Sequence, residues 1–276
     1  MPPKSKLGQN FLHDASAIQR IVAALGDCSS RTVVEIGPGK GAITSLLAAR
    51  AQHVLAIEFD RELALRLRDT LPPERVTIVS QDVLDFDFAA AASATGERLL
   101  VVGNLPYYIT SPILLHLAAS HASLQSAVLM VQREVADRVV AVPGSRDYGL
   151  LSATVQLYGP VERLFTLPPS AFSPPPQVHS TVFRWHFAPR IAELQIDEAP
   201  FLAFLRQAFA QKRKTLANNL RAAGSTPDRI AAALTQAGVA PQARAETLSL
   251  RQFAVLWRSL KAERAASPSE AAPPIS

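Results

Sequence analysis

The stretch VVEIGPGKGA, residues 33–42, decides the fold class, because an apolar β-branched run ends there in a glycine-rich turn that leads into a helical pattern. Glycines let a backbone approach a ligand closely, and the free N–H groups at a helix start can hold polar or anionic groups. The turn is typical of the first βα unit of a nucleotide-binding sheet. It also fits the glycine pattern of dinucleotide-binding dehydrogenases, and a plain tight turn is a third interpretation.

Outward from this turn, short β-branched runs alternate with helical patterns over about residues 32–187. This alternation predicts successive βα units, and therefore an α/β fold with a mostly parallel sheet of about seven strands. The predicted strands are 32–36, 53–57, 76–79, 99–102, 127–131, 161–166 and 181–187. The predicted helices within this region are 41–50, 60–71 and 111–120.

The rest of the chain divides around this sheet. We predict a catalytic domain over residues 1–190, of which 1–30 form an N-terminal arm and a helix that Asp14 caps. From residue 191 to 264 the pattern is purely helical, which predicts a smaller all-helical domain. Residues 265–276 are small, polar or proline, and we expect a disordered tail.

The composition excludes several classes of protein. The chain has 276 residues, 48% hydrophobic and 18% charged, and no apolar run long enough to cross a membrane. The start of the sequence does not resemble a signal peptide, so we expect a cytoplasmic protein without a membrane partner. The only cysteine, Cys28, cannot form an internal disulfide, and the histidines lack metal-ligand spacing. We therefore predict no metal site.

Positive charge is concentrated in the helical region. Residues 201–264 contain eleven Lys or Arg and three Asp or Glu, which suggests either a polyanionic partner or a solvated helical surface. Among these cations we choose Lys212, Arg213, Lys214 and Arg221 for contact with an RNA backbone. Near the N-terminus, Lys4 and Lys6 suit a phosphate-contacting arm, or are simply an exposed basic end.

Two carboxylates follow the next strands after the glycine turn. Glu58 ends the second predicted strand, where it can accept hydrogen bonds from both ribose hydroxyls of an adenosine moiety. Asp82 follows the third strand and could accept from an adenine amino group, although an aspartate that caps a turn is nearly as well supported. Together with Gly37 and Gly39, these residues predict a cofactor site at the carboxyl edge of the sheet.

The sequence NLPYY, residues 104–108, follows the fourth strand and has the form Asn-x-Pro-aromatic. The exocyclic nitrogen of adenine is a poor nucleophile, because its lone pair is delocalised into the ring. The Asn104 side-chain oxygen and the Leu105 carbonyl could each accept one amine hydrogen and draw that lone pair out of conjugation. Pro106 stiffens the turn, and Tyr107 presents a face on which a base extruded from its stack can rest.

Four motifs in this order carry a resemblance: KLGQNFL (6–12), EIGPG (35–39), NLPY (104–107) and FSPPPQV (172–178). Together they resemble the ribosomal RNA adenine dimethyltransferase family, and among its branches the bacterial small-subunit (16S) one, over about residues 4–262. The resemblance implies a Rossmann-like class I methyltransferase sheet with S-adenosylmethionine as the cofactor. It also implies dimethylation of N6 at two adjacent adenosines in the terminal hairpin of 16S RNA, during assembly of the small subunit.

The same resemblance implies particular site residues. It places the target base between Tyr107 and Phe172, and Phe172 lies in a proline-braced loop that could hold a ring ready for stacking or anchor it in the core. The cofactor contacts that it implies are Asn10, Leu12, Gly37, Glu58, Asp82 and Asn104.

Other functions remain open at this stage. A related methyltransferase that modifies large-subunit RNA and confers macrolide resistance shares the cofactor site and the Asn-x-Pro-Tyr motif. An assembly factor that acts mainly by binding the immature small subunit is a second alternative. A nicotinamide dehydrogenase is less favoured, because no residue for a hydride site can be assigned. Nothing in the sequence demands a partner chain, so we expect a monomer.

Overall fold

The computed structural model describes residues 10–266. By contacts between residues the chain divides into two compact units, which we describe separately. Unit 1 comprises residues up to Val140 together with Tyr158–Pro189, and unit 2 comprises Ala141–Leu157 together with the residues from Arg190 onward. The prediction divided the chain between residues 190 and 191, beside the crossing between Pro189 and Arg190, and it gave Ala141–Leu157 to the catalytic domain and not to the helical one.

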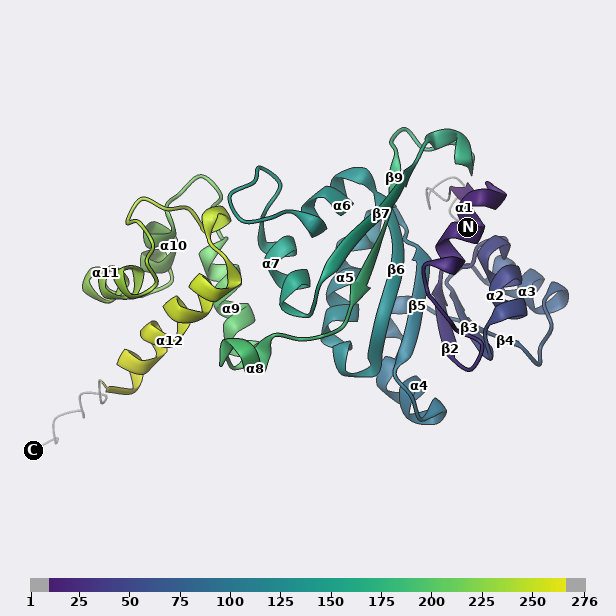
Figure 1. Cartoon of the computed structure of the whole chain (residues 1–276), viewed down its shortest axis with the longest axis horizontal. Helices are drawn as coiled ribbons and strands as arrows, with labels where there is room; N and C mark the ends of the chain where they lie inside the picture. The colour runs from purple at the N-terminus through teal and green to yellow at the C-terminus, as the bar shows by residue number, and fades with distance from the viewer. Residues whose placement is uncertain (1–9, 267–276) are drawn as a thin grey trace, which may run out of the picture. The chain divides into compact units, whose positions relative to one another are not determined.

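Unit 1 is built on a seven-stranded sheet with the order β4-β3-β2-β5-β6-β9-β7. The first five strands in this order are parallel, and β9 pairs antiparallel with both β6 and β7. The prediction of an α/β fold with a mostly parallel sheet is therefore confirmed (Figure 1). The strands are β2 (Thr32–Ile36), β3 (His53–Glu58), β4 (Val76–Ser80), β5 (Leu99–Asn104), β6 (Leu124–Gln132), β7 (Val161–Leu167) and β9 (Ser180–His186).

The helices of unit 1 connect these strands in the expected βα alternation. Three of the six α-helices begin with an aspartate whose side chain accepts a backbone N–H, as Asp14 and Asp60 do for the helices that follow them. The α-helices are α1 (Ala15–Ala23), α2 (Ala42–Arg50), α3 (Arg61–Thr70), α4 (Phe88–Thr95), α5 (Thr110–Ala119) and α6 (Arg133–Val140). Short 3₁₀ turns lie at η1 (Val83–Asp85), η2 (Tyr107–Ile109), η3 (His121–Ser123) and η4 (Pro169–Ala171).

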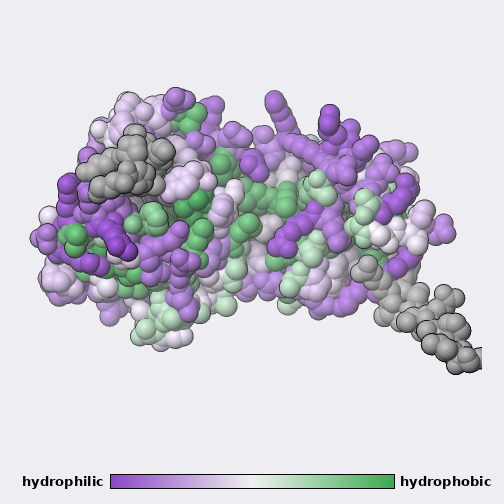
Figure 2. Space-filling model, turned by 180° about the vertical axis from the view of Figure 1, so that it is seen from behind, coloured by the Kyte–Doolittle hydropathy of each residue, from purple (hydrophilic) through white to green (hydrophobic). Residues whose placement is uncertain are grey.

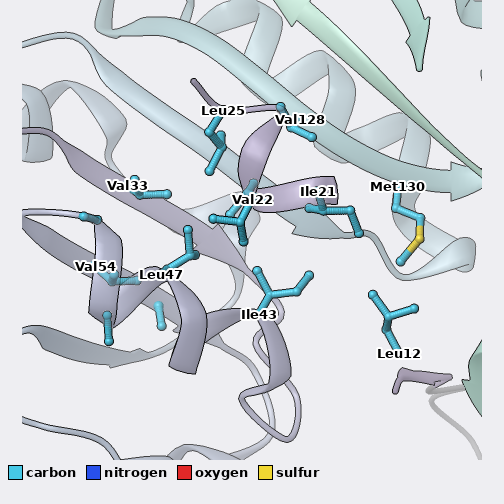
Figure 3. Close-up of a cluster of buried hydrophobic side chains, with 14 of the residues drawn as sticks. Leu12, Ile21, Val22, Leu25, Val33, Ile43, Leu47, Val54, Val128 and Met130 are labelled. Atoms are coloured by element: carbon cyan, nitrogen blue, oxygen red, sulfur yellow. The ribbon is translucent and has the colours of Figure 1, made fainter. Parts of the chain in front are cut away.

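The core of unit 1 forms where α1 and α2 pack on the central strands. Figure 3 shows Val22 of α1 toward Leu47 of α2 and Val33 of β2, and Ile21 of α1 toward Ile43 of α2. β2 is buried along its whole length, as expected for a parallel strand covered on both faces. Leu12, from the N-terminal arm, belongs to the same hydrophobic cluster, so the arm is packed onto the sheet at this point.

A second, two-stranded sheet joins distant parts of the sequence. β1 (Phe11–Leu12) pairs antiparallel with β8 (Phe172–Ser173), and the His13 N–H donates to the Ala171 carbonyl at 3.0 Å. The N-terminal arm is thereby fixed to the proline-rich loop between β7 and β9.

Unit 2 is helical. Its elements are α7 (Leu150–Leu157), α8 (Ile191–Leu194), α9 (Glu198–Ala208), α10 (Leu216–Ala222), α11 (Pro227–Gln236), η5 (Ala245–Thr247) and α12 (Leu250–Ala266). An aromatic cluster packs α12 against α9. The ring centroid of Phe253 in α12 lies 6.4 Å from that of Phe204 in α9 and 5.5 Å from that of Phe209, which follows α9 directly. The first two residues of the predicted tail, Ala265 and Ala266, belong to α12, and its other residues lie outside the described part of the chain.

Candidate active site

A cavity of about 390 Å³ opens at the carboxyl ends of the parallel strands of unit 1. This is where ligands bind in open α/β sheets, because the loops that follow neighbouring strands meet at that edge. The cavity wall brings together all the predicted cofactor residues and four of the five predicted catalytic residues. They are Asn10, Leu12, Gly37, Gly39, Glu58, Asp82, Asn104, Leu105, Pro106 and Tyr107.

The glycine turn leaves room for a ligand against bare backbone. Gly37 and Gly39 have φ angles of +67° and +59°, in the left-handed region that favours glycine. A Cβ on Gly39 would lie 3.0 Å from the ring of Phe11 in β1, so a side chain there would disturb the N-terminal arm. The arm closes over the turn, and the Lys40 ammonium lies 4.7 Å from the centre of the Phe11 ring.

Glu58 is held by backbone N–H groups at the end of β3. Its side chain accepts hydrogen bonds from Gly39 N at 3.0 Å and from Asp60 N at 2.9 Å. The residue is only 4% exposed, and burial raises the pKa of its carboxyl while these hydrogen bonds lower it. The carboxylate is therefore fixed in the cavity wall beside the glycine turn, where the hydroxyls of a ribose can reach it.

The two carboxylate oxygens of Asp82 can accept hydrogen bonds from different donors. One, Oδ1, accepts from the Leu84 N–H at 2.9 Å and caps η1, so the capping role considered from the sequence is present. The residue is nonetheless in the cavity wall and only half-buried. A carboxylate with one oxygen fixed in this way can present the other to an amino group.

Asn104 links the end of β5 to the N-terminal arm. Its Nδ2 donates to the Asn10 carbonyl at 3.0 Å, which engages the donor side of the amide. The acceptor Oδ1 makes no such contact with the described residues, so it is available to accept a hydrogen from a substrate amine. Leu105 follows with its N–H donating to the Met130 carbonyl at 3.0 Å, which fixes the course of the loop across β6.

Tyr107 lies in η2 with its ring half-buried at the cavity. Its hydroxyl shares a hydrogen bond of 2.8 Å with Ser180 Oγ at the start of β9, and burial raises its pKa. This bond holds the ring at the cavity wall, so the face is in place before a base arrives.

Phe172 differs from the prediction of a ring held ready for stacking. It is 2% exposed, belongs to the hydrophobic cluster of unit 1, and is not among the residues that line the cavity. The physical reason is the β1–β8 pair: Phe172 lies opposite Leu12, and both side chains face the core. Burial of an aromatic ring stabilises by about 2–3 kcal/mol, so the core-facing alternative prevails.

Sequence reasoning missed Glu35, within β2. The residue is among those that line the cavity although it is only 1% exposed, and its Oε2 has no hydrogen-bond partner within the described residues. Thr44 Oγ1, also fully buried, is likewise unsatisfied there. A carboxyl inside the otherwise apolar stretch 33–36 was the signal that could have identified it. The open glycine turn and the carboxylates of Glu58 and Asp82 in one wall fit a ligand with an adenosine moiety and a charged amino acid part.

We expect the stability of the protein to depend on pH through Glu35. Burial raises the pKa of this carboxyl to about 8, from about 4.5 in the unfolded chain. The folded state therefore binds more protons between these values, and its stability falls as the pH rises through this window. Glu35→Gln should remove this dependence, so that between pH 5 and 8.5 the variant gains roughly 3 kcal/mol relative to wild type.

Urea unfolding of both proteins at several pH values, without added cofactor, measures this difference. Parallel curves for wild type and variant over the whole range would show that Glu35 does not titrate in this way.

The predicted RNA-binding residues of unit 2 lie on its surface. α9 ends at Ala208, and the exposed Lys212, Arg213 and Lys214 form the loop before α10. This break in the apolar pattern of residues 201–220 occurs beside Lys212, where a cation falls on the apolar face. Arg221 is exposed on α10, and hydrophilic side chains predominate over the helical unit on the face shown in Figure 2. Lys4 and Lys6 lie outside the described residues.

Asn219, which sequence reasoning did not identify, supports this loop. The residue is 3% exposed, and its Nδ2 donates to the carbonyls of Ala208 at 2.7 Å and Gln211 at 3.3 Å. The side chain thereby caps the end of α9 and fixes the start of the cationic loop.

Two further features of residues 10–266 concern metals and membranes. No three His, Cys, Asp or Glu side chains there are grouped to hold a metal ion. No helix in that range has the length and apolar character required to cross a bilayer.

Comparison with known proteins places the chain in a family. The model of the family described as "Ribosomal RNA adenine dimethylase" matches residues 3–261. "Ribosomal RNA small subunit methyltransferase A" of Acidobacterium capsulatum is 61% identical over 94% of this chain and 91% of that protein. The protein of the same name from Koribacter versatilis is 50% identical over 94% of each chain.

Solved structures agree with the fold. A dimethyladenosine transferase from Plasmodium falciparum superposes with a TM-score of 0.78 at 23% identity, over 92% of this chain and 98% of that one. The 23S rRNA methyltransferase ErmE gives a TM-score of 0.70 at 26% identity, over 91% and 100% respectively. The chain belongs to the ribosomal RNA adenine dimethylase family of S-adenosylmethionine-dependent methyltransferases.

Proposed function

We propose that the protein dimethylates N6 of two adjacent adenosines in the 3′-terminal hairpin of 16S rRNA, during assembly of the small ribosomal subunit. The observation that carries this proposal is Asn104, whose amide donor is engaged by the arm while its acceptor faces no partner among the described residues. The names of the most similar relatives support the small subunit as the substrate. We further propose that it acts in the cytoplasm as a monomer without a metal ion.

In the proposed mechanism, the cofactor site is formed by Asn10, Leu12, Gly37, Gly39, Glu58, Asp82 and Asn104. S-adenosylmethionine held by these residues would supply an electrophilic methyl group for transfer to the amine nitrogen, with S-adenosylhomocysteine as the leaving group and an N–H proton lost to solvent. Glu58 would accept hydrogen bonds from the ribose hydroxyls of the cofactor, and Asp82 would accept one from its adenine amino group. The glycine turn gives the methionine part access to backbone N–H groups.

The substrate side of the cavity prepares the amine. Asn104 Oδ1 and the Leu105 carbonyl each accept one amine hydrogen, which directs the nitrogen lone pair toward the methyl group. Pro106 restricts the turn that places them, and Tyr107 supplies the stacking face. Phe172, buried in the hydrophobic cluster, anchors β8 by packing. No strong base is needed before transfer, because the nitrogen becomes acidic once it carries the additional methyl group.

We propose unit 2 as the RNA-binding part, with Lys212, Arg213, Lys214 and Arg221 contacting phosphates. The binding constant K falls as the salt concentration rises, so log K against log salt concentration has a negative slope. Replacing the first three residues together by Gln should make this slope less steep by roughly 2 to 3, because each lost phosphate contact removes about 0.7–0.9. Binding of a 16S RNA fragment at several salt concentrations measures this slope.

The control replaces two exposed cations on α3, Arg61 and Arg66, by Gln. The same change of slope per replaced residue in both variants would show that the loop has no special role in RNA contact.

The function itself is tested by transfer of labelled methyl from S-adenosylmethionine to small subunits that lack the modification, with large subunits in parallel. Dimethyladenosine in the small subunit alone supports the proposal. Label confined to the large subunit would assign the resistance-type activity, and tight subunit binding without label would assign an assembly factor.

A further inference from the structure

The two adjacent tyrosines of η2 have different surroundings. Tyr107 is half-buried and fixed by Ser180, as described above. Tyr108 is 60% exposed, although it lines the same cavity. Successive residues of a 3₁₀ turn point in different directions, about 120° apart, so the two rings cannot serve the same ligand group.

A second exposed aromatic ring lies in the same cavity wall. Phe59 follows Glu58 directly and is 59% exposed. Large apolar side chains scattered singly on a surface need no explanation, but two in the wall of one cavity indicate a binding surface.

The charged neighbours of Tyr108 locate its ring. Partial burial raises the pKa of its hydroxyl, and the negative charges of Asp82 and Glu58 raise it further. Tyr108 therefore lies on the side of the cavity that holds these two carboxylates.

We propose that Tyr108 is a cofactor-binding residue, whose ring stacks with Phe59 on the adenine of bound S-adenosylmethionine and covers the mouth of the cavity, while Tyr107 serves the target base. This rests on the proposed placement of the adenosine part between Glu58 and Asp82. An adenine has polar edges and two apolar faces. The carboxylate of Asp82 suits an edge, and the two exposed rings suit the faces.

Stacking on one aromatic ring contributes enough to change affinity about tenfold when the ring is removed. We therefore expect Tyr108→Ala to raise the Kd for S-adenosylhomocysteine about tenfold by calorimetry. Tyr108→Phe, which keeps the ring, should stay within about twofold of wild type. Tyr107→Ala should also stay within about twofold, and so should Leu65→Ala, which removes a side chain 58% exposed on α3 and outside the cavity wall.

Adenosine alone serves as a second probe, because it lacks the methionine part. Tyr108→Ala should weaken adenosine binding by the same factor as it weakens S-adenosylhomocysteine binding. In Tyr108→Trp, the new indole should lose fluorescence when either ligand is added, against a background from Trp185 and Trp257, which are both buried.

Glu58→Ala separates failure of this inference from failure of the proposed cofactor placement. If Glu58→Ala weakens S-adenosylhomocysteine binding and Tyr108→Ala does not, Tyr108 does not contact the cofactor and the inference is overturned. If neither variant weakens binding, the placement of the adenosine part is wrong and the inference falls with it. Weakened binding in Tyr107→Ala but not in Tyr108→Ala would reverse the assignment of the two rings.

Discussion

Asn104→Ala should lower kcat for methyl transfer to immature small subunits by roughly 10²–10³-fold. Hydrogen-bonding groups placed in advance at a reacting atom commonly contribute this much, because they act in a site from which water is excluded. In this protein the hydrogen bond from Asn104 Nδ2 to the Asn10 carbonyl orients the amide, so that Oδ1 is already directed as an acceptor. Alanine removes the acceptor and frees the arm from β5 at the same time.

Asn104→Asp keeps an acceptor in place but cannot donate to the Asn10 carbonyl, so it separates these two roles. Rates measured with saturating RNA and cofactor report the chemical step, and the Kd for S-adenosylhomocysteine reports the cofactor site. We expect Asn104→Ala to weaken cofactor binding only a few-fold. Activity retained within tenfold of wild type in Asn104→Ala would rule out the mechanism proposed for the amine.

The strands of the sheet were predictable because parallel strands are buried on both faces and read as short apolar runs. β2, which is buried along its whole length, was predicted with the same bounds that it has in the structure. The position of the cavity at the carboxyl edge of the sheet was predictable from the same alternation, since Gly37, Glu58, Asp82 and Asn104 each lie at or just after the end of a strand.

What the sequence could not predict depends on long-range contacts. The pairing of β1 with β8 joins segments about 160 residues apart, and no local pattern marks it. That pairing turns Phe172 into the core and brings Asn10 to Asn104, so one unpredicted contact accounts for both the buried position of Phe172 and this hydrogen bond.

The apolar positions from Phe201 to Leu220 share one helical face, but Lys212 interrupts it, which indicates that the helix bends or ends there. The structure ends α9 at Ala208 and uses Asn219 to cap it, a contact that no local pattern marks. Similarly, a carboxyl within a buried strand has no periodic signature, and Glu35 became visible as a site residue only once the cavity was located.

Gly159→Ala should lower the free energy of unfolding of unit 1 by about 4 kcal/mol or more, which is exceptional for a single methyl group. Gly159 joins α7 to β7 with φ +143°, a backbone conformation that L side chains rarely adopt. A Cβ there would lie 1.9 Å from the His186 carbonyl oxygen and 2.8 Å from Ala188 N. Both are backbone atoms at the end of β9, so no side-chain rotation can relieve the contact.

The backbone around Gly159 cannot move away easily either. The Ala188 N–H donates to the Tyr158 carbonyl at 2.9 Å and the His186 N–H to the Pro160 carbonyl at 3.1 Å, on either side of the glycine. Relief of the contact would break one of these bonds or shift Trp185, which is fully buried and pairs with Val161. The substitution therefore acts on the antiparallel edge of the sheet and leaves the cofactor cavity at the parallel strands unchanged in composition.

Gly26→Ala is the matched control, because Gly26 also has a positive φ, of +80°, but nothing lies within 4 Å of its would-be Cβ. This substitution should lower the free energy of unfolding only through the unfavourable φ angle, by about 1 kcal/mol. Urea unfolding followed by circular dichroism compares the two variants with wild type, and S-adenosylhomocysteine binding reports whether the remaining folded fraction keeps its cavity. Equal losses in the two variants would mean that the contact with β9 relaxes freely, and that only the φ angle requires glycine at position 159.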